Sequence, residues 1–182
     1  RQEIENILLS GLASDNNQVV DFCKKHLQDN SQIFVVCPYI DESENKDIKA
    51  AEKVYEQYID LFPDSNVKIL HGRMKSEEKE LIMSQMNNGK IDILVSTVVI
   101  EVGIDITNAT LMIIESAERF GLNQLHQLRG RVGRGSKKSQ CIFHISNKLT
   151  IDTVTDVGKQ RLSAIVSTND GFKLSEMDLQ IR

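Results

Sequence analysis

Short apolar runs rich in β-branched residues alternate along this chain with longer segments in which apolar side chains recur at helical spacing. Parallel strands need long crossover connections, so this alternation predicts a mostly parallel sheet with helices on both faces. The expected fold is a three-layer α/β/α domain with right-handed crossovers. Strands are predicted at 33–38, 67–70, 91–96, 111–114 and 140–145, and helices at 16–28, 41–62, 76–86, most of 124–134, 151–165 and 174–182. Gly130 and Gly133 weaken the helix within 124–134, so its end is expected to be tight or irregular.

The two ends of the chain differ from this pattern. Residues 3–10 form an apolar stretch that favours neither a helix nor a strand. Residues 150–182 hold two helical patterns around the turn signal Thr168–Gly171, which predicts a helical hairpin, packed on or projecting from an α/β domain of residues 1–149. Because the chain begins at Arg1 rather than Met, we expect a piece of a longer protein.

Composition limits the possible partners. The net charge of −4 provides no overall attraction to nucleic acid, but residues 119–150 contain seven Lys and Arg and no acid, so a polyanion should meet that part. No apolar run approaches the roughly 20 residues that span a membrane, and we expect no membrane partner. Cys23, Cys37 and Cys141 form no CxxC pair, which predicts buried free thiols in a reducing, cytoplasmic compartment.

Acidic residues at 41–44 suit the start of a helix, and we prefer this interpretation to metal binding. Ser76 is expected to cap the next helix. The inner face of the helix that follows residue 44 is predicted to hold Ile48, Ala51, Tyr55, Tyr58, Ile59 and Phe62.

The stretch from Gln124 to Arg134 combines amides, glycines and arginines at regular spacing. If it is helical, Gln124, Gln127, Arg131 and Arg134 lie within about a quarter-turn of one another. Arginine suits phosphate, because its planar fork donates two parallel hydrogen bonds and stays charged. A solvated basic face is the alternative, and the spacing of Gln, Gly and Arg favours a phosphate ligand.

A second unusual stretch follows the strand predicted at 91–96. Thr97 could bond a phosphate through its hydroxyl group, and Asp105, beyond Gly103, could accept from a ribose hydroxyl or position an arginine. A helix cap followed by a turn explains these residues equally well. In parallel sheets ligands bind outside the carboxyl ends of strands, where this stretch and the turn His71–Met74 are expected.

Complete catalytic motifs are missing from the sequence. The P-loop pattern is absent, since Gly130–Lys137 places Ser136 where the lysine belongs, and no GxGxxG follows a strand. The chain alone is therefore not expected to hold a nucleotide tightly. His71, His126 and His144 are scattered and are expected to be structural or partly exposed.

Several segments together resemble one family. Thr97–Asp105 is similar to motif V, and Gln127, Gly130, Arg131 and Arg134 to motif VI, of superfamily 2 helicases. The sequence around these motifs resembles the RecG family of ATP-dependent DNA helicases over about residues 34–182. The resemblance implies that this chain corresponds to the second RecA-like lobe of RecG. The matching segments are Pro38–Glu44, His71–Met74, Val99–Gly103, Glu118–Leu122, Gln124–Gly135 and Asn169–Phe172.

For ATP, the resemblance implies a site shared between two lobes. ATP and Mg²⁺ would be held mainly by a first lobe outside this chain. Arg131 and Arg134 would act as arginine fingers, Gln127 would position them or the attacking water, and Gly103 and Asp105 would approach the nucleotide. This chain alone should have little activity.

For DNA, the resemblance implies remodelling of stalled replication forks and other branched DNA. Thr97 would contact the DNA backbone, and Gly72 and Arg73 would lie near the DNA track. The other expected partners are the N-terminal RecA-like lobe and wedge domain of the same polypeptide. The coupling motif should begin near Arg182, directly after the hairpin.

Other interpretations stay open. A transcription-repair coupling factor shares both motifs, but Pro38–Glu44 fits RecG better. A non-catalytic helicase-like binding module is disfavoured by the arginines, and an ordinary Rossmann-like enzyme by the missing glycine fingerprint.

Overall fold

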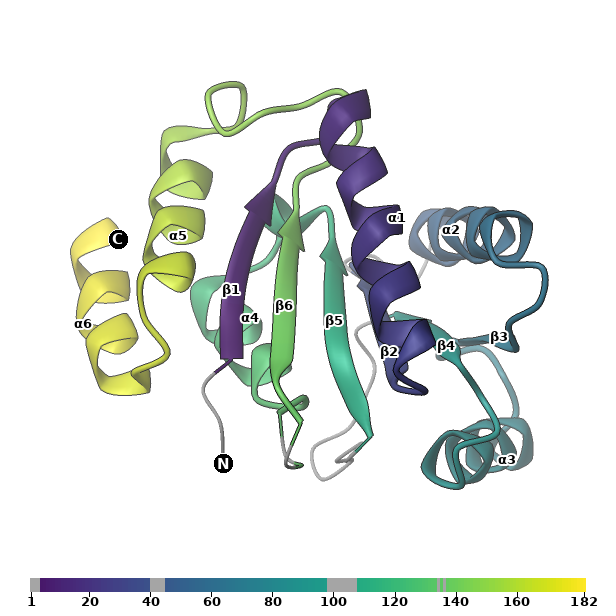
Figure 1. The fold of residues 1–182 in the computed structure, drawn as a ribbon. Coiled ribbons are helices and arrows are strands. Elements are labelled where there is room, and N and C mark those ends of the chain that lie inside the picture. The colour runs from purple at the N-terminus through teal and green to yellow at the C-terminus, as the bar shows by residue number, and fades with distance from the viewer. Residues whose placement is uncertain (1–3, 40–44, 98–107, 134, 136) are drawn as a thin grey trace.

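The computed structural model describes residues 4–39, 45–97, 108–133, 135 and 137–182. A six-stranded sheet with the order β1-β6-β5-β2-β4-β3 forms its centre, and all of its strand pairs are parallel (Figure 1). The predicted α/β fold with a mostly parallel sheet is therefore confirmed. The strands are β1 (Ile4–Leu9), β2 (Gln32–Cys37), β3 (Val67–Leu70), β4 (Ile93–Thr97), β5 (Ala109–Glu115) and β6 (Ser139–His144).

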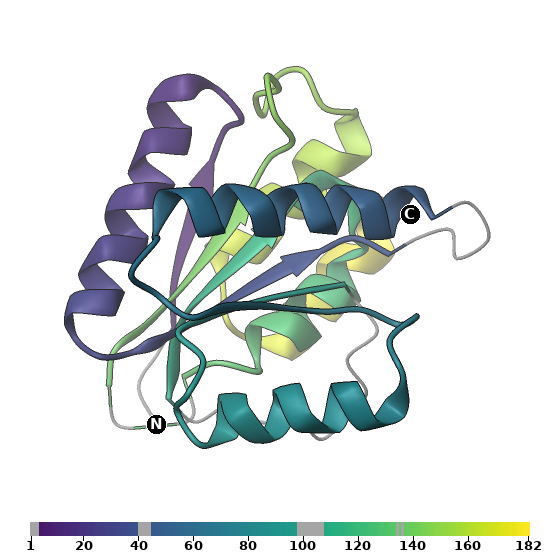
Figure 2. The ribbon, with the colours of Figure 1, turned by 90° about the vertical axis from the view of Figure 1, so that its right-hand side faces the viewer.

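Helices cover both faces of this sheet, as Figures 1 and 2 show from two sides. One face packs against α1 (Ala13–Gln28) and α2 (Lys46–Leu61). The other packs against α3 (Ser76–Asn87), α4 (Leu122–Arg129), α5 (Asp156–Ser167) and α6 (Gly171–Ile181), with a 3₁₀ turn, η1 (Ala117–Arg119), before α4. None of the described helices is long and apolar enough to cross a membrane.

The central strands are apolar on both faces because each face meets a helical layer. In β2, Ile33 and Val35 join the cluster beneath α1 and α2, whereas Phe34 and Val36 join the opposite cluster. Residues 4–10, which the sequence pattern did not classify, include β1, which pairs with β6 from Ile4↔Ser139 to Leu9↔His144. Residues 4–9 are identified as a strand only by their pairing with β6.

The three cysteines lie in the apolar clusters between the sheet and its helices. Cys23, Cys37 and Cys141 are free and buried, as the sequence predicted. Burial raises the pKa of Cys23 and of Cys141 to about 12, and that of Cys37 further still. These thiols therefore act as small apolar side chains of the core.

The expectation that residues 124–134 are helical for most of their length and end tightly or irregularly is confirmed. The helix α4 stops at Arg129, with Gly130 as its C-cap, and the Arg131 N–H bonds Leu128 O at 2.9 Å, three residues back. Gly133 has φ +77°, which a helix cannot contain. Arg131 therefore leaves the helix and does not share a helical face with Gln127.

Other helix ends differ because capping side chains decide them. Ser76 is the first residue of α3 and does not cap it, since Lys75 occupies the N-cap. The Thr155 hydroxyl accepts from Gly158 N–H and starts α5, later than the predicted residue 151. The Asp170 carboxylate accepts from Phe172 N–H and starts α6 at Gly171, earlier than predicted.

The predicted inner face of α2 is partly wrong. Ile59 is 39% exposed, whereas Ile48, Ala51, Tyr58 and Phe62 are buried. The predicted acidic start of this helix at 41–44 lies outside the described residues.

The predicted C-terminal hairpin is present and packs on the core. It consists of α5 and α6, which contact each other and α4 (Figure 1). A buried arginine joins the parts, because Arg129 donates to Ile165 O of α5 at 2.6 Å and to Asn6 Oδ1 of β1 at 3.3 Å. Asn169, between α5 and α6, completes the joint by bonding Asn6 and Ile4 O.

His126 is the third partner of Arg129. Its Nδ1 accepts from the guanidinium at 2.9 Å, so the ring is neutral. Desolvation and the Arg129 charge lower the pKa of His126. A Cβ on Gly171 would lie 2.8 Å from His126 Nε2, so α6 approaches α4 closely at this point.

An ion pair joins the carboxyl ends of β5 and β6 to α1. His144 Nδ1 lies 2.9 Å from Glu115 Oε2, and Nε2 lies 2.7 Å from Asn16 Oδ1. The Asn16 amide nitrogen donates to Gly11 O, so its oxygen faces the ring, and only the imidazolium can donate to both acceptors. Desolvation opposes this charge, but Glu115 and Asp15 outweigh it and raise the pKa of His144.

We predict that Arg129→Ala lowers the free energy of unfolding of this chain by about 3 kcal/mol, because it leaves buried acceptors on Ile165 and Asn6 unpaired. Chemical denaturation measures this change. Lys173→Ala, on the exposed side of α6, is the control and should change stability by less than about 0.5 kcal/mol. Equal effects of the two substitutions would contradict the structural role of Arg129.

We predict that the stability lost by His144→Gln depends on pH. Because the folded-state pKa of His144 is raised, its ion pair contributes fully below the unfolded value of about 6.5 and is lost as pH rises through the folded pKa. The wild type should therefore exceed the variant by more at about pH 6 than at about pH 8.5. Urea denaturation at both pH values tests this, and a constant difference would argue against a charged His144.

Candidate functional site

The predicted site residues lie at opposite edges of the sheet. Since all strands are parallel, their carboxyl ends share one edge, where Thr97 ends β4 and His71 follows β3. The helix α4 then carries the chain back across the sheet, so Arg131 lies near the amino ends of the strands. The rule that places ligands at the carboxyl ends therefore applies to Thr97 and the His71–Met74 turn, and not to Arg131.

At the carboxyl edge, Thr97 has an unusual environment. Its side chain is 1% exposed, and its hydroxyl group has no hydrogen-bond partner among the residues that the structure describes. The neighbouring Ser96 hydroxyl instead donates to Thr97 O at 2.9 Å. Buried hydroxyl groups are rarely unpaired, so the Thr97 hydroxyl is a candidate ligand-binding group.

The turn after β3 lies beside Thr97. Leu70 pairs with Ser96, so the next positions of the two strands, His71 and Thr97, are neighbours. Two hydrogen bonds close the turn, from Met74 N–H to His71 O at 3.2 Å and from Arg73 N–H to His71 Nδ1 at 3.3 Å. Gly72 is half-buried and Arg73 is exposed.

At the amino edge, the segment around Arg131 is anchored on both sides. Val132 is fully buried, and a Cβ on Gly133 would lie 3.0 Å from Ile4 Cγ1, so the backbone rests on the start of β1. Farther along, Lys137 Nζ donates to Asp29 O at 3.3 Å and to the Ser31 hydroxyl at 3.2 Å. The half-buried Arg131 therefore belongs to a loop whose backbone is supported on both sides.

The amides of α4 have different surroundings. The Gln124 side chain accepts from Gly121 N–H at 3.0 Å and caps the helix, which makes it structural. Gln127 is exposed, one turn before the helix ends. The sequence analysis grouped these two residues with the arginines, and the structure separates Gln124 from the candidate site.

Four polar residues have clear structural roles that the sequence did not predict. Besides Arg129 and Lys137, the buried His26 bonds the Thr110 hydroxyl at 2.6 Å and Gln140 Oε1 at 2.8 Å. The Glu118 carboxylate accepts from both the backbone N–H and the hydroxyl group of Ser146. No sequence signal identified these partners, because they are distant in the chain.

Three predicted residues, Gly103, Asp105 and Arg134, lie outside the described residues. Within the part of the chain that the structure describes, no group of three His, Cys, Asp or Glu side chains could hold a metal ion. Among the described residues, Arg131 at the amino edge and Gln127 near the end of α4 carry groups that can bond phosphate oxygens.

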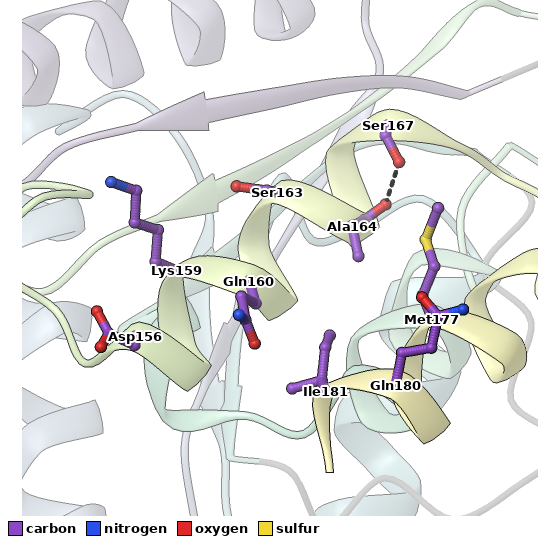
Figure 3. A pocket seen from close by; sticks show the side chains of 9 residues that line it. All are labelled: Asp156, Lys159, Gln160, Ser163, Ala164, Ser167, Met177, Gln180 and Ile181. Atoms are coloured by element: carbon purple, nitrogen blue, oxygen red, sulfur yellow. Dashed lines mark hydrogen bonds between the residues drawn. The ribbon is translucent and has the colours of Figure 1, made fainter.

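An open groove of about 720 Å³ lies between α5 and α6 (Figure 3). None of the predicted site residues that the structure describes lines it. The lining residues are Asp156, Lys159, Gln160, Ser163, Ala164, Ser167, Met177, Gln180 and Ile181.

The chain is similar in sequence and fold to known helicases. The family model of the helicase conserved C-terminal domain matches residues 15–136. The chain is 42% identical over 183 residues to the ATP-dependent DNA helicase RecG of Synechocystis sp., covering 100% of this chain and 21% of that protein. It is 48% identical over 166 residues to the RecG of Streptococcus pneumoniae, covering 91% of this chain and 24% of that protein.

Solved structures give the same result. The structure of RecG bound to a three-way DNA junction matches with a TM-score of 0.80 and 38% identity, over 100% of this chain and 22% of that chain. The helicase Lhr of Mycobacterium smegmatis matches at 17% identity with a TM-score of 0.64, which supports the fold alone.

The matched chain spans less than a quarter of the length of these RecG relatives. The family model covers most of the chain, and the RecG similarity extends over its whole length. The chain therefore belongs to the helicase conserved C-terminal domain family and is a RecA-like helicase lobe of the RecG type.

Proposed function

We propose that this chain is the second motor lobe of an ATP-dependent DNA helicase that remodels stalled replication forks and branched DNA, including Holliday junctions. One observation carries the proposal: the candidate DNA-contacting and ATP-contacting groups lie at opposite edges of one sheet. A lobe with this arrangement can contact DNA and a neighbouring nucleotide-binding lobe at the same time. The names of the RecG relatives and the junction-bound RecG structure support this substrate class.

For ATP, Arg131 and Arg134 are proposed to reach the γ-phosphate as arginine fingers. Hydrolysis of ATP supplies the free energy for movement, and positive charge at the transferring phosphoryl group stabilises its transition state. Gln127, exposed near the end of α4, would position these arginines or the attacking water, while Gly103 and Asp105 would approach the nucleotide. The P-loop is absent from the sequence, so a first lobe would hold most of the ATP and Mg²⁺.

For DNA, the ends of β3 and β4 offer a hydroxyl group, a glycine and the exposed side chain of Arg73. Thr97 provides an unpaired hydroxyl group, Gly72 allows close backbone approach, and Arg73 can pair with a phosphate. Contacts of this kind recognise the DNA backbone and carry no base sequence information. They suit a motor that must act on forks of any sequence.

The remaining partners are parts of the same polypeptide. We propose that an N-terminal RecA-like lobe completes the ATP site, that a wedge domain meets the branch point, and that the α5–α6 hairpin, within the unit formed by residues 150–182, connects to a coupling motif. The protein would act in the bacterial cytoplasm at the nucleoid, where its DNA substrate is found.

We predict that Arg131→Ala or Arg134→Ala in the full-length protein lowers ATP hydrolysis by about 10³-fold, because each removes charge from the transition state. A fluorescent ATP analogue should still bind, since the first lobe supplies most contacts. Lys138→Ala, an exposed basic residue nearby, is the control and should hydrolyse ATP like the wild type. Normal turnover in both arginine variants would exclude the arginine-finger assignment.

We predict that a model replication fork strongly stimulates ATP hydrolysis by the full-length protein, whereas this 182-residue chain hydrolyses no ATP under any condition. The measurement compares fork, plain duplex and no DNA for both proteins. Equal rates with and without DNA in the full-length protein would argue against a DNA motor. Turnover by the chain alone would show that it contains a complete nucleotide site.

A further inference from the structure

The proposed arginine finger Arg131 lies in a loop, residues 130–138, that contacts outside α4 hold in place. This finger loop runs from the C-cap of α4 to the start of β6. Helical hydrogen bonding continues only through its first residues, since Val132 N–H bonds Arg129 O at 3.4 Å and Gly133 has φ +77°. The course of the rest of the finger loop therefore depends on other elements of the lobe.

The first of these contacts lies at Gly133. This residue is buried, and a Cβ there would lie 3.0 Å from Ile4 Cγ1 and 3.5 Å from Ser139 Cβ. The loop backbone thus fits against the start of β1 and β6, which pair with each other at Ile4↔Ser139. This contact fixes the finger loop two residues beyond Arg131.

The second contact is made by the side chain of Lys137. Its Nζ donates to Asp29 O at 3.3 Å and to the Ser31 hydroxyl group at 3.2 Å. Asp29 is the C-cap of α1, so the ammonium group meets the negative end of that helix, where a cation is favoured. In the sheet, β5 lies between β6, which follows the finger loop, and β2, which follows Ser31. The bond therefore links the finger loop, across the end of β5, to the turn between α1 and β2.

The next residue, Lys138, offers a direct comparison. It is exposed and carries the same charge, but within the part of the chain that the structure describes it has no hydrogen bond or ion pair. The two lysines therefore differ in their contacts with α1 and the following turn, and not in charge.

We propose that Lys137 is a positioning residue for ATP hydrolysis: its bonds to α1 and Ser31 hold the finger loop so that Arg131 and Arg134 meet the γ-phosphate without a rearrangement of the loop. This proposal rests on the proposed arginine-finger function. In sequence, the contact with Ile4 precedes Arg134 and the contact of Lys137 follows it. A loop that is fixed on both sides loses little conformational freedom when its arginines bind a phosphate, which favours the transition state. Lys137 acts through the arginines and not on the nucleotide.

Substitutions of Lys137 in the full-length protein test this role. Lys137→Met removes the ammonium group and keeps an apolar stem, and Lys138→Met removes the same charge from the next residue. Lys137→Arg keeps a cationic donor, and Ser31→Ala removes one acceptor from the other side of the bond. Thermal unfolding checks that every variant is folded at the assay temperature.

ATP hydrolysis is measured with saturating model fork over a range of ATP concentrations. Lys137→Met should lower kcat by about 3- to 10-fold and leave the KM for ATP within about 2-fold, because displaced fingers weaken the transition state while the first lobe still holds ATP. Lys138→Met should retain wild-type values, and Lys137→Arg should retain at least about half of the wild-type kcat. Ser31→Ala should also lower kcat, and adding it to Lys137→Met should cause less than about a 2-fold further loss, since both remove the same bond.

A second comparison separates positioning from direct phosphate binding. In an Arg131→Ala plus Arg134→Ala background, followed under single-turnover conditions, Lys137→Met should cause less than about a 2-fold further loss, because a positioning residue acts only through the arginines. An undiminished loss in that background, or equal kcat values for Lys137→Met and Lys138→Met, would overturn the proposal. If the arginine variants themselves hydrolyse ATP normally, the arginine-finger function fails and the proposal fails with it. Inactive arginine variants beside a normal Lys137→Met variant would overturn the positioning role alone.

Discussion

The parallel direction of every strand is the constraint on which this lobe depends. A parallel sheet gathers all of its carboxyl ends at one edge and all of its amino ends at the other. Each crossover helix must carry the chain back, so residues after a strand and residues after a helix are separated by the length of the sheet. Thr97 and His71 belong to the first group, and Arg131 belongs to the second. The proposed DNA contacts and the proposed ATP contacts therefore lie at opposite edges of one lobe.

Buried polar side chains hold the loops and helices around the sheet in place. Arg129 joins α4 to α5 and β1, and the His144–Glu115 pair joins β5, β6 and α1. Such groups are costly to bury alone, so each is surrounded by its partners. Apolar packing tolerates small shifts, whereas these hydrogen bonds require particular distances. They define how the hairpin and the carboxyl edge sit on the core, which matters for a lobe proposed to transmit movement.

The sequence predicted five of the strands and the α/β class because β-branched runs and helical spacing are local signals. Prediction failed where a contact distant in the chain decided the outcome. The strand β1 needs β6 as its partner, and the pattern of residues 3–10 alone favoured neither a helix nor a strand. Gln124 belonged by spacing to the group with Gln127 and the arginines, but its side chain caps α4. Helix periodicity cannot distinguish a cap from a ligand.

By itself, the sequence determined the family resemblance, the absence of a P-loop and the residue types available for phosphate, because these depend only on residue identity and spacing. Tertiary structure decided which of those residues share a surface. It separated Thr97 from Arg131, made Arg129 structural and made Gln124 a helix cap. The physical reason is that hydrogen bonds and burial depend on neighbours in space, which the fold brings together from distant parts of the chain.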